Sequence, residues 1–344
     1  MKILDFRSDT VTLPTKEMLE AMTHAKLGDD VYGDDETINR LELLAAEKIG
    51  KEAALFVPSG TMGNLIAVMA HTTPGQEIIL EESCHIYLYE VAGIARLAGV
   101  QARTIPGING LPPLEAIKNA VRQENIHFPE TGLISLESTH NMSGGMTLPL
   151  KEMASIYHFA KEKGIPVHLD GARLFNAAKH LQVEAKEITR YTDSVMFCLS
   201  KGLSAPVGSI LAGTQDFIVK ARKLRKMLGG GMRQAGVIAA AGIVALEGMV
   251  DRLAEDHVNA LLLAKELNSI KGVSVDLEKV HSNIINVDFY ETGFKAPGLA
   301  SKMKDKGLLV NPRNDRVIRF VTHRGVGKEE VASAVEVVKE ILKG

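Results

Sequence analysis

An acid, an arginine and a lysine lie at the ends of two short apolar runs. Asp170 and Arg173 follow the run 165–169, and Lys201 follows the run 194–199. Runs of this length are typical of buried strands, and neighbouring strand ends gather at one edge of an α/β sheet. We therefore expect the three side chains to converge on one crevice. A lysine amine can form a Schiff base with an aldehyde, and a carboxylate can hold a protonated pyridine nitrogen, so this set suits pyridoxal 5'-phosphate (PLP).

Each of these residues also has a plain structural interpretation. Asp170 could cap a helix over 172–178, Arg173 could be a surface cation, and most lysines are solvated. We favour the functional interpretation because Lys201 follows an apolar run and does not lie on a helix face. In that interpretation, Arg173 binds the ring oxygen of the cofactor or the carboxylate of a substrate.

The segment 57–64 predicts a phosphate site. It follows a strand candidate and begins a helix, with Ser59 as a suitable N-cap. Gly60 lets the backbone approach an anion, and the first helical N–H groups and the Thr61 hydroxyl can hold a phosphate. Such a segment is more often a plain cap, but here the same sheet edge is expected to have the lysine and the aspartate. Neither a Walker P-loop nor a G-x-G-x-x-G motif is present, so ATP and dinucleotides fit less well.

A basic segment over 223–234 is a second source of anion-binding groups. Its three consecutive glycines, 229–231, imply a close backbone approach or an unusual turn. Arg233, just beyond them, can present a fixed fork to phosphate oxygens. We interpret Lys223 and Arg225 as part of a solvated helix face.

His85 follows the strand candidate 77–80, where an imidazole could stack on a pyridine ring. A lone histidine is more often a packing or capping residue, so this position alone is a weak indication. No H-x-x-x-H motif or Cys/His cluster appears, and we interpret His140 and His168 as packing residues. We predict no catalytic metal, while a structural cation stays open.

Composition limits the class of protein. The chain has 344 residues, so two domains are expected. A net charge of −2 offers no long-range attraction to nucleic acid or anionic lipid. Two cysteines cannot form a disulfide framework, the N-terminus has no apolar leader, and the longest apolar stretch, 235–246, is too short to span a bilayer. We expect a cytoplasmic protein without nucleic-acid or membrane partners.

Short apolar runs alternate with helical stretches from about residue 53 to 213, which predicts a doubly wound, mostly parallel α/β sheet. The strand candidates are 54–57, 77–80, 100–105, 133–136, 167–170, 194–199 and 209–212. The helical stretches are 62–71, 86–97, 113–123, 151–163, 215–228 and 234–267. The tail over 273–342 mixes strands and helices. We place a large PLP-binding domain, with the N-terminal segment, at 1–250 and a small α+β domain at 251–344.

The chain resembles the low-specificity L-threonine aldolases, PLP-dependent enzymes of fold type I, the aspartate aminotransferase-like fold. The resemblance covers nearly the whole chain and rests on the stretches 4–12, 28–33, 56–64, 168–173, 198–202, 227–234 and 319–323. Two departures are Ser138, where the family usually has Asn, and Phe6, where Leu is more usual. Neither is an expected catalytic residue. The implied fold has a large domain with a mostly parallel seven-stranded sheet and a small C-terminal α+β domain.

The resemblance also implies roles around the cofactor. Lys201 looks like the residue that forms the Schiff base with PLP, and Asp170 like the partner of the pyridine nitrogen. His85 looks like the stacking imidazole, and Gly60 and Thr61 like phosphate ligands.

Around the substrate, Ser8, Arg173 and Arg319 look like the clamp on the α-carboxylate. Tyr32 and His127 resemble residues near the substrate hydroxyl, with His127 supplied by a partner subunit.

Two further residues, Arg233 and Lys226, are similar to residues that reach the phosphate from a neighbouring subunit. The resemblance therefore implies a homo-oligomer with shared active sites, a dimer at minimum and usually a tetramer of two such dimers.

The implied reaction is retro-aldol cleavage of L-threonine, L-allo-threonine and related β-hydroxy-α-amino acids to glycine and an aldehyde. His85, His127 or a water they hold would remove the β-hydroxyl proton. Another fold-type-I reaction (serine hydroxymethyl transfer, β-elimination or racemisation) is the first alternative. A non-catalytic PLP-binding protein is the second, disfavoured by the intact lysine, aspartate and arginines. A metal-dependent aldolase lacks the expected ligand spacing.

Overall fold

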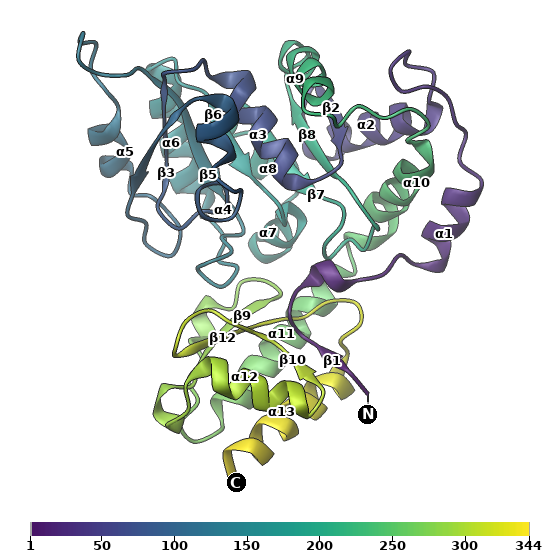
Figure 1. Ribbon diagram of the computed structural model, residues 1–344, viewed down its shortest axis with the longest axis vertical. Coiled ribbons are helices and arrows are strands. Elements are labelled where there is room, and N and C mark those ends of the chain that lie inside the picture. Colours follow the sequence, from purple (N-terminus) through teal and green to yellow (C-terminus); the bar gives the residue numbers. More distant parts are fainter. Residues whose placement is uncertain (1, 344) are drawn as a thin grey trace.

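A seven-stranded sheet forms the centre of the larger part of the protein (Figure 1). The structure is a computed structural model and describes residues 2–343. Strand order is β2-β8-β7-β6-β5-β3-β4, and only β8 runs against the other strands. The strands are β2 (Ala53–Val57), β3 (Glu77–Glu81), β4 (Gln101–Ile105), β5 (Thr131–Glu137), β6 (Val167–Asp170), β7 (Ser194–Cys198) and β8 (Ser209–Gly213). The predicted mostly parallel sheet is confirmed.

Helices pack on this sheet because its central strands are buried on both faces. Every residue of β3, β6, β7 and β8 is buried, as the continuous apolar runs predict. The helices of the larger part are α1 (Lys16–Thr23), α2 (Glu36–Ile49), α3 (Gly60–His71), α4 (His85–Leu88), α5 (Leu114–Ala120), α6 (Leu150–Glu162), α7 (Leu174–Leu181), α8 (Ala185–Thr189), α9 (Gln215–Met227) and α10 (Gly236–Val244). Among residues 2–343, no helix combines the length and apolar character needed to cross a bilayer.

Two predicted helices are interrupted. The stretch 86–97 forms α4, then a turn with positive φ at Val91 and Ala92, then a π-helical segment, Ile94–Ala98. The turn directs the Glu90 carboxylate inward, where it contacts His85. That contact is invisible to helical periodicity. The stretch 234–267 likewise divides into α10, a π-helical segment Ala245–Met249, and α11 (Leu253–Asn268).

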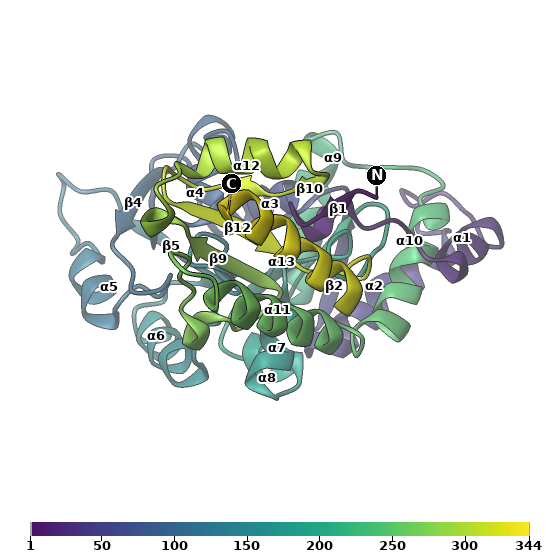
Figure 2. The same ribbon diagram turned by 90° about the horizontal axis from the view of Figure 1, so that it is seen from below.

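The smaller part contains the three-stranded antiparallel sheet β11-β12-β9 and the helices around it (Figure 2). Besides α11, the smaller part consists of β9 (Ile284–Asp288), α12 (Ala296–Asp305), β10 (Leu308–Leu309), β11 (Asn311–Pro312), β12 (Val317–Val321) and α13 (Lys328–Lys343). The helices α11, α12 and α13 together enclose a separate hydrophobic cluster.

The N-terminal strand lies with this smaller part, and not with the larger one as expected. β1 (Leu4–Asp5) pairs in parallel with β10. Phe6 is fully buried, and its ring meets that of Phe320 edge-on at 6.1 Å. The apolar contacts of β1 and Phe6 hold this segment against the smaller part. The local sequence pattern does not indicate these contacts. The boundary near residue 250 stays a prediction.

Candidate active site

Two adjoining cavities lie where β6 and β7 end. One has a volume of about 250 Å³ and is lined by Ser8, His85, Asp170, Arg173, Lys201 and Arg319, among others. The other, of about 300 Å³, is lined by Gly60, Thr61, His85, Asp170 and Lys201, among others. The aspartate, the lysine and His85 thus border both. The structure brings eight predicted site residues together around these two adjoining cavities.

Asp170 ends β6 and is held by two hydrogen bonds. Its Oδ2 accepts from Asn64 Nδ2 at 2.9 Å, and its Oδ1 accepts from the backbone N–H of Ala172 at 3.1 Å. Burial lowers the pKa of His168 to about 3, so this ring is neutral where it contacts the Asn64 amide oxygen at 3.1 Å. α7 begins only at Leu174, so the aspartate is not its cap. Its fixed, 2 % exposed carboxylate is suited to one specific partner.

Lys201 follows β7 in a tight segment. Its carbonyl oxygen accepts from Thr12 Oγ1 at 3.0 Å, whereas its amine has no hydrogen-bond partner among residues 2–343. At the next residue, Gly202, a Cβ would lie 2.8 Å from Leu253 Cδ2, so a side chain there would push the segment off α11. The backbone is thus anchored while the amine is available in the cavity.

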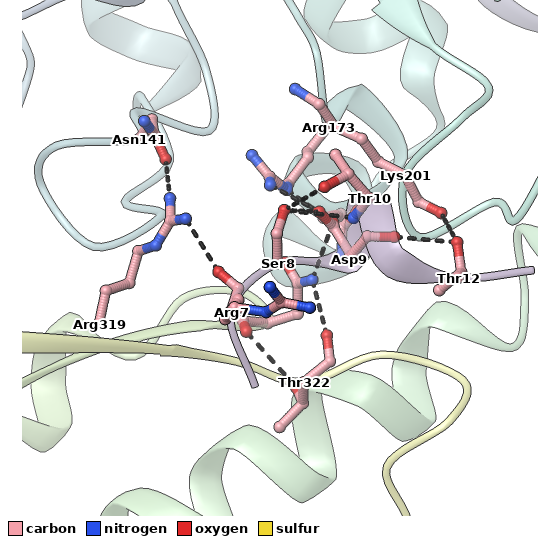
Figure 3. A network of polar contacts seen from close by, with 12 residues as sticks. Arg7, Ser8, Asp9, Thr10, Thr12, Asn141, Arg173, Lys201, Arg319 and Thr322 are labelled. Atoms are coloured by element: carbon pink, nitrogen blue, oxygen red, sulfur yellow. Dashed lines mark hydrogen bonds and ion pairs between the residues drawn. The ribbon is translucent and has the colours of Figure 1, made fainter. Parts of the chain in front are cut away.

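Asp9 orients Arg173 with a two-point ion pair (Figure 3). Arg173 Nε and Nη2 each lie 2.7 Å from one Asp9 carboxylate oxygen, and Asn283 Nδ2 donates to the same carboxylate at 3.0 Å. Burial alone would raise the pKa of Asp9, but the charge and hydrogen bonds of Arg173 outweigh it and hold the pKa below its ordinary range. Arg173 Nη1 has no protein partner among the described residues and lies free for a ligand.

Ser8 and Arg319 border the same space. Ser8 caps a 3₁₀ turn, and its Oγ accepts from the N–H of Thr10 at 3.2 Å. Arg319, on β12, donates from Nη1 to Asn141 Oδ1 at 2.7 Å and from Nη2 to the Arg7 carbonyl at 3.0 Å. Burial and, after it, the charges of Arg313 and Arg173 lower the pKa of Arg319 to about 9. An anion would relieve this uncompensated positive charge.

His85 begins α4 and is fixed at two points. Its backbone N–H donates to Glu137 Oε2 at 2.6 Å, and its ring Nδ1 lies 2.8 Å from Glu90 Oε1. Burial lowers the pKa of His85, but the Glu90 hydrogen bond and the charges of Asp170 and Glu90 outweigh it, so the pKa is raised. The side chains of His85, Glu90 and Asp170 also bring atoms that could bind a metal ion within 4.8 Å of one another. We interpret them as a hydrogen-bonded network, because His85 and Glu90 touch directly.

The N-terminus of α3 has free donors beside the second cavity. Ser59 Oγ accepts from the N–H of Met62 at 3.2 Å, while the N–H groups of Gly60 and Thr61 have no protein partner in the described chain. A Cβ on Gly60 would lie 3.0 Å from Cys198 Sγ, so glycine lets the helix start against β7. Free N–H groups at a helix start favour an anion.

Four predicted site residues lie outside these cavities in the single chain. Tyr32, His127, Lys226 and Arg233 are all exposed, and Arg233 pairs with Asp29 at 3.0 Å. Their proposed action in a partner subunit's site stays a prediction.

The helix face assigned to solvent needs one correction. Arg225 is buried, pairs with Asp30 and donates to the Phe56 carbonyl at 2.8 Å. Its buried acid partner is 195 positions away in sequence, which local pattern cannot reveal. Beyond it, a Cβ on Gly230 would lie 2.3 Å from Met62 Sδ, so the predicted close approach is to α3.

Sequence reasoning missed the residues that support the site: Asp9, Asn64, Glu90, Glu137 and Asn141. All are polar side chains whose partners are brought near by the fold. Asp9 and Asn64, which lie in the stretches 4–12 and 56–64, could have been suspected.

Comparison with known proteins gives concordant matches. The family model described as beta-eliminating lyase matches residues 5–289. "Low-specificity L-threonine aldolase 1" of Arabidopsis thaliana is 46% identical, with 96% of this chain and 94% of that protein covered. "Low specificity L-threonine aldolase" of Escherichia coli strain K12 is 44% identical, with 96% of each chain covered. A solved structure of Leishmania major threonine aldolase has a TM-score of 0.84 at 21% identity, covering 98% of this chain and 99% of that one, which shows the shared fold.

Proposed function

We propose that this chain, which belongs to the low-specificity L-threonine aldolase family among the beta-eliminating lyases, is an aldehyde-lyase. It cleaves the Cα–Cβ bond of L-threonine, L-allo-threonine and related β-hydroxy-α-amino acids, releasing glycine and an aldehyde. One observation supports this most: a free lysine amine and a fixed carboxylate border the same space as arginines that can hold an α-carboxylate.

The residues of the two cavities fit PLP. Lys201 would hold its aldehyde carbon, Asp170 its protonated ring nitrogen, and the N–H groups at Gly60 and Thr61 its phosphate. The His85 imidazole would lie against the ring. When bound, PLP supplies the electron sink that accepts the electron pair of the breaking bond. The unpartnered amine and the free helix N–H groups are the structural support for this assignment.

The substrate side orients the amino acid. Ser8, Arg173 through its free Nη1, and Arg319 would bind the α-carboxylate. Binding of the α-carboxylate limits rotation at Cα. The orientation of Cα then decides which of its bonds is positioned for cleavage. Asp9 contributes by holding the Arg173 guanidinium in one orientation.

A neutral imidazole at His85 would accept the β-hydroxyl proton, with His127 of a partner subunit as the alternative. The Glu90 contact raises the pKa of His85, so activity should rise as pH increases through that raised value. We expect Glu90→Gln to move the acidic limb of the kcat/KM profile to lower pH, because the imidazole then loses its proton earlier. A limb that does not move in this variant would favour His127.

Product analysis tests the reaction itself. Purified enzyme supplied with PLP and L-threonine should release glycine and acetaldehyde in equal amounts. Ammonia and 2-oxobutanoate would instead indicate elimination, and formation of D-alanine from L-alanine would indicate racemisation. No product from any amino acid by a PLP-loaded protein would favour the non-catalytic alternative.

We also propose a homo-oligomer with shared sites, a dimer at minimum. Exposed apolar side chains lie next to exposed site candidates: Val31 beside Tyr32, Ile126 beside His127, and Met227 beside Lys226. Such residues on a free chain favour burial against another copy. The free, buried cysteines Cys84 and Cys198 support a reducing, cytoplasmic location.

Subunit mixing tests the shared site. Lys201→Ala and Arg233→Ala should each be nearly inactive alone. In a mixed dimer, one site keeps its own lysine and receives the intact Arg233 of the partner, so activity should return. Native mass spectrometry would verify exchange. Mixed dimers with no more activity than the separate variants would contradict shared sites.

A further inference from the structure

Arg313 borders the substrate side of the site without a role in the scheme above. It lies between β11 and β12 and lines the 250 Å³ cavity beside Arg173 and Arg319. Its Nη2 lies 3.1 Å from Asn141 Oδ1 and 3.4 Å from the Asn141 carbonyl oxygen. Its Nε is buried and has no hydrogen-bond partner within residues 2–343. The guanidinium is therefore only partly satisfied by the protein.

The charge of Arg313 has no acid partner. Within 2–343 neither Arg313 nor Arg319 makes an ion pair, whereas Arg173 pairs with Asp9. Burial lowers the pKa of Arg313, as expected for a cation without a counter-ion.

The two carboxylates that line this cavity are engaged elsewhere. Glu137 accepts from the backbone N–H groups of His85 at 2.6 Å and Asn141 at 2.7 Å. Asp170 accepts from Asn64 and Ala172. Neither carboxylate pairs with an arginine of the cavity, so the positive charge is available to a ligand.

Two unpaired guanidinium groups exceed what a monocarboxylate needs. One α-carboxylate brings one negative charge, and the proposed clamp already supplies Arg319 and the free Nη1 of Arg173 for it. Asn141 Oδ1 contacts both Arg319 and Arg313, so these two cations are neighbours. A ligand with two carboxylates separated by two carbon atoms would match neighbouring cations, and Arg can bind a carboxylate at two points.

We propose that Arg313 binds a second carboxylate, carried on Cβ of the substrate, so that 3-hydroxyaspartate is a substrate of this site. This inference rests on the proposed function and names a substrate class for it. The Cα–Cβ bond breaks, the β-hydroxyl loses its proton, and the Cβ fragment leaves as glyoxylate. Cα gains a proton and leaves as glycine. Atoms and electrons balance without an oxidant, as they do for L-threonine.

The experiment compares kcat/KM for 3-hydroxyaspartate and for L-threonine in the PLP-loaded enzyme and its variants. Arg313→Met keeps much of the side-chain volume and removes the charge. The control is Arg316→Met, since Arg316 lies nearby but pairs with Asp288 at 2.7 Å on the exposed side. Arg313→Met removes one member of a partly buried charge pair. It should therefore lower the ratio of kcat/KM for 3-hydroxyaspartate to kcat/KM for L-threonine roughly 30-fold or more. The control should leave the ratio unchanged.

Inhibition provides a second measurement, because L-aspartate has both carboxylates but no β-hydroxyl to cleave. It should inhibit L-threonine cleavage by the unmodified enzyme roughly tenfold more strongly than L-alanine, and this preference should vanish in Arg313→Met. An enzyme that cleaves L-threonine but not 3-hydroxyaspartate would overturn the inference. So would a ratio unchanged in Arg313→Met. Failure to cleave L-threonine would instead count against the proposed function.

Discussion

Lys201→Ala should reduce cleavage of L-threonine by roughly four orders of magnitude or more, as loss of a covalent catalytic group does in other enzymes. Among residues 2–343, Lys201 is the only lysine that lines either cavity, and it borders both. The variant should also lose the absorbance of the protein-bound cofactor. Both are measured on protein purified with PLP.

Lys223→Ala is the matched control, because Lys223 is an exposed residue of α9 outside both cavities. It should retain activity and absorbance. A Lys201→Ala protein that folds and keeps substantial activity would refute the assignment of the lysine.

Asp9→Asn should lower the free energy of unfolding by about 3–5 kcal/mol, since it leaves the buried Arg173 without its carboxylate. It should also raise KM for L-threonine, because the guanidinium loses its fixed orientation. Chemical unfolding near neutral pH and steady-state kinetics measure the two effects. Asp5→Asn is the matched control: Asp5 pairs with the exposed Arg7, and such a surface pair contributes about 0–1 kcal/mol.

The pH dependence of this stability follows from the direction of the shift. The pKa of Asp9 in the folded protein lies below its ordinary value of 3.8. Its contribution is therefore fully present above 3.8 and is lost as pH falls through the lower folded value. The difference between the original protein and Asp9→Asn should stay constant from neutral pH to about pH 5 and shrink in stronger acid. A difference that grows on acidification, or none at neutral pH, would contradict the role of this ion pair.

Strand positions could be predicted because buried parallel strands are continuous apolar runs. β6 ends at Asp170 as predicted, and β7 ends one residue before the predicted end. The interruptions of the helices could not be predicted, because they depend on side-chain contacts that form only in the folded protein. The turn after α4 exists where Glu90 reaches His85 and Asn64, and residues 86–97 contain no proline to indicate it.

Part of the site can be predicted from the sequence, because several of its reactive side chains come directly after apolar runs that predict strands. Asp170, Arg173 and Lys201 can be identified in this way. Ser8 and Arg319 came only from family resemblance, since a turn serine and a strand arginine are common. Asp9 was missed because its partner, Arg173, is 164 positions away in sequence. No local sequence pattern indicates Arg313; its place in the cavity and its partly satisfied guanidinium are seen only in the folded protein.

Locating the cofactor on the chain tests the role of Lys201 directly. Borohydride reduces a Schiff base to a stable amine, so treatment of the PLP-loaded protein followed by peptide mass spectrometry identifies the modified lysine. We predict a single pyridoxyl adduct, on Lys201, that is absent when excess L-threonine or glycine is added before reduction. An adduct on another lysine in an active enzyme, or full activity with no adduct, would contradict the assignment of the Schiff base to Lys201.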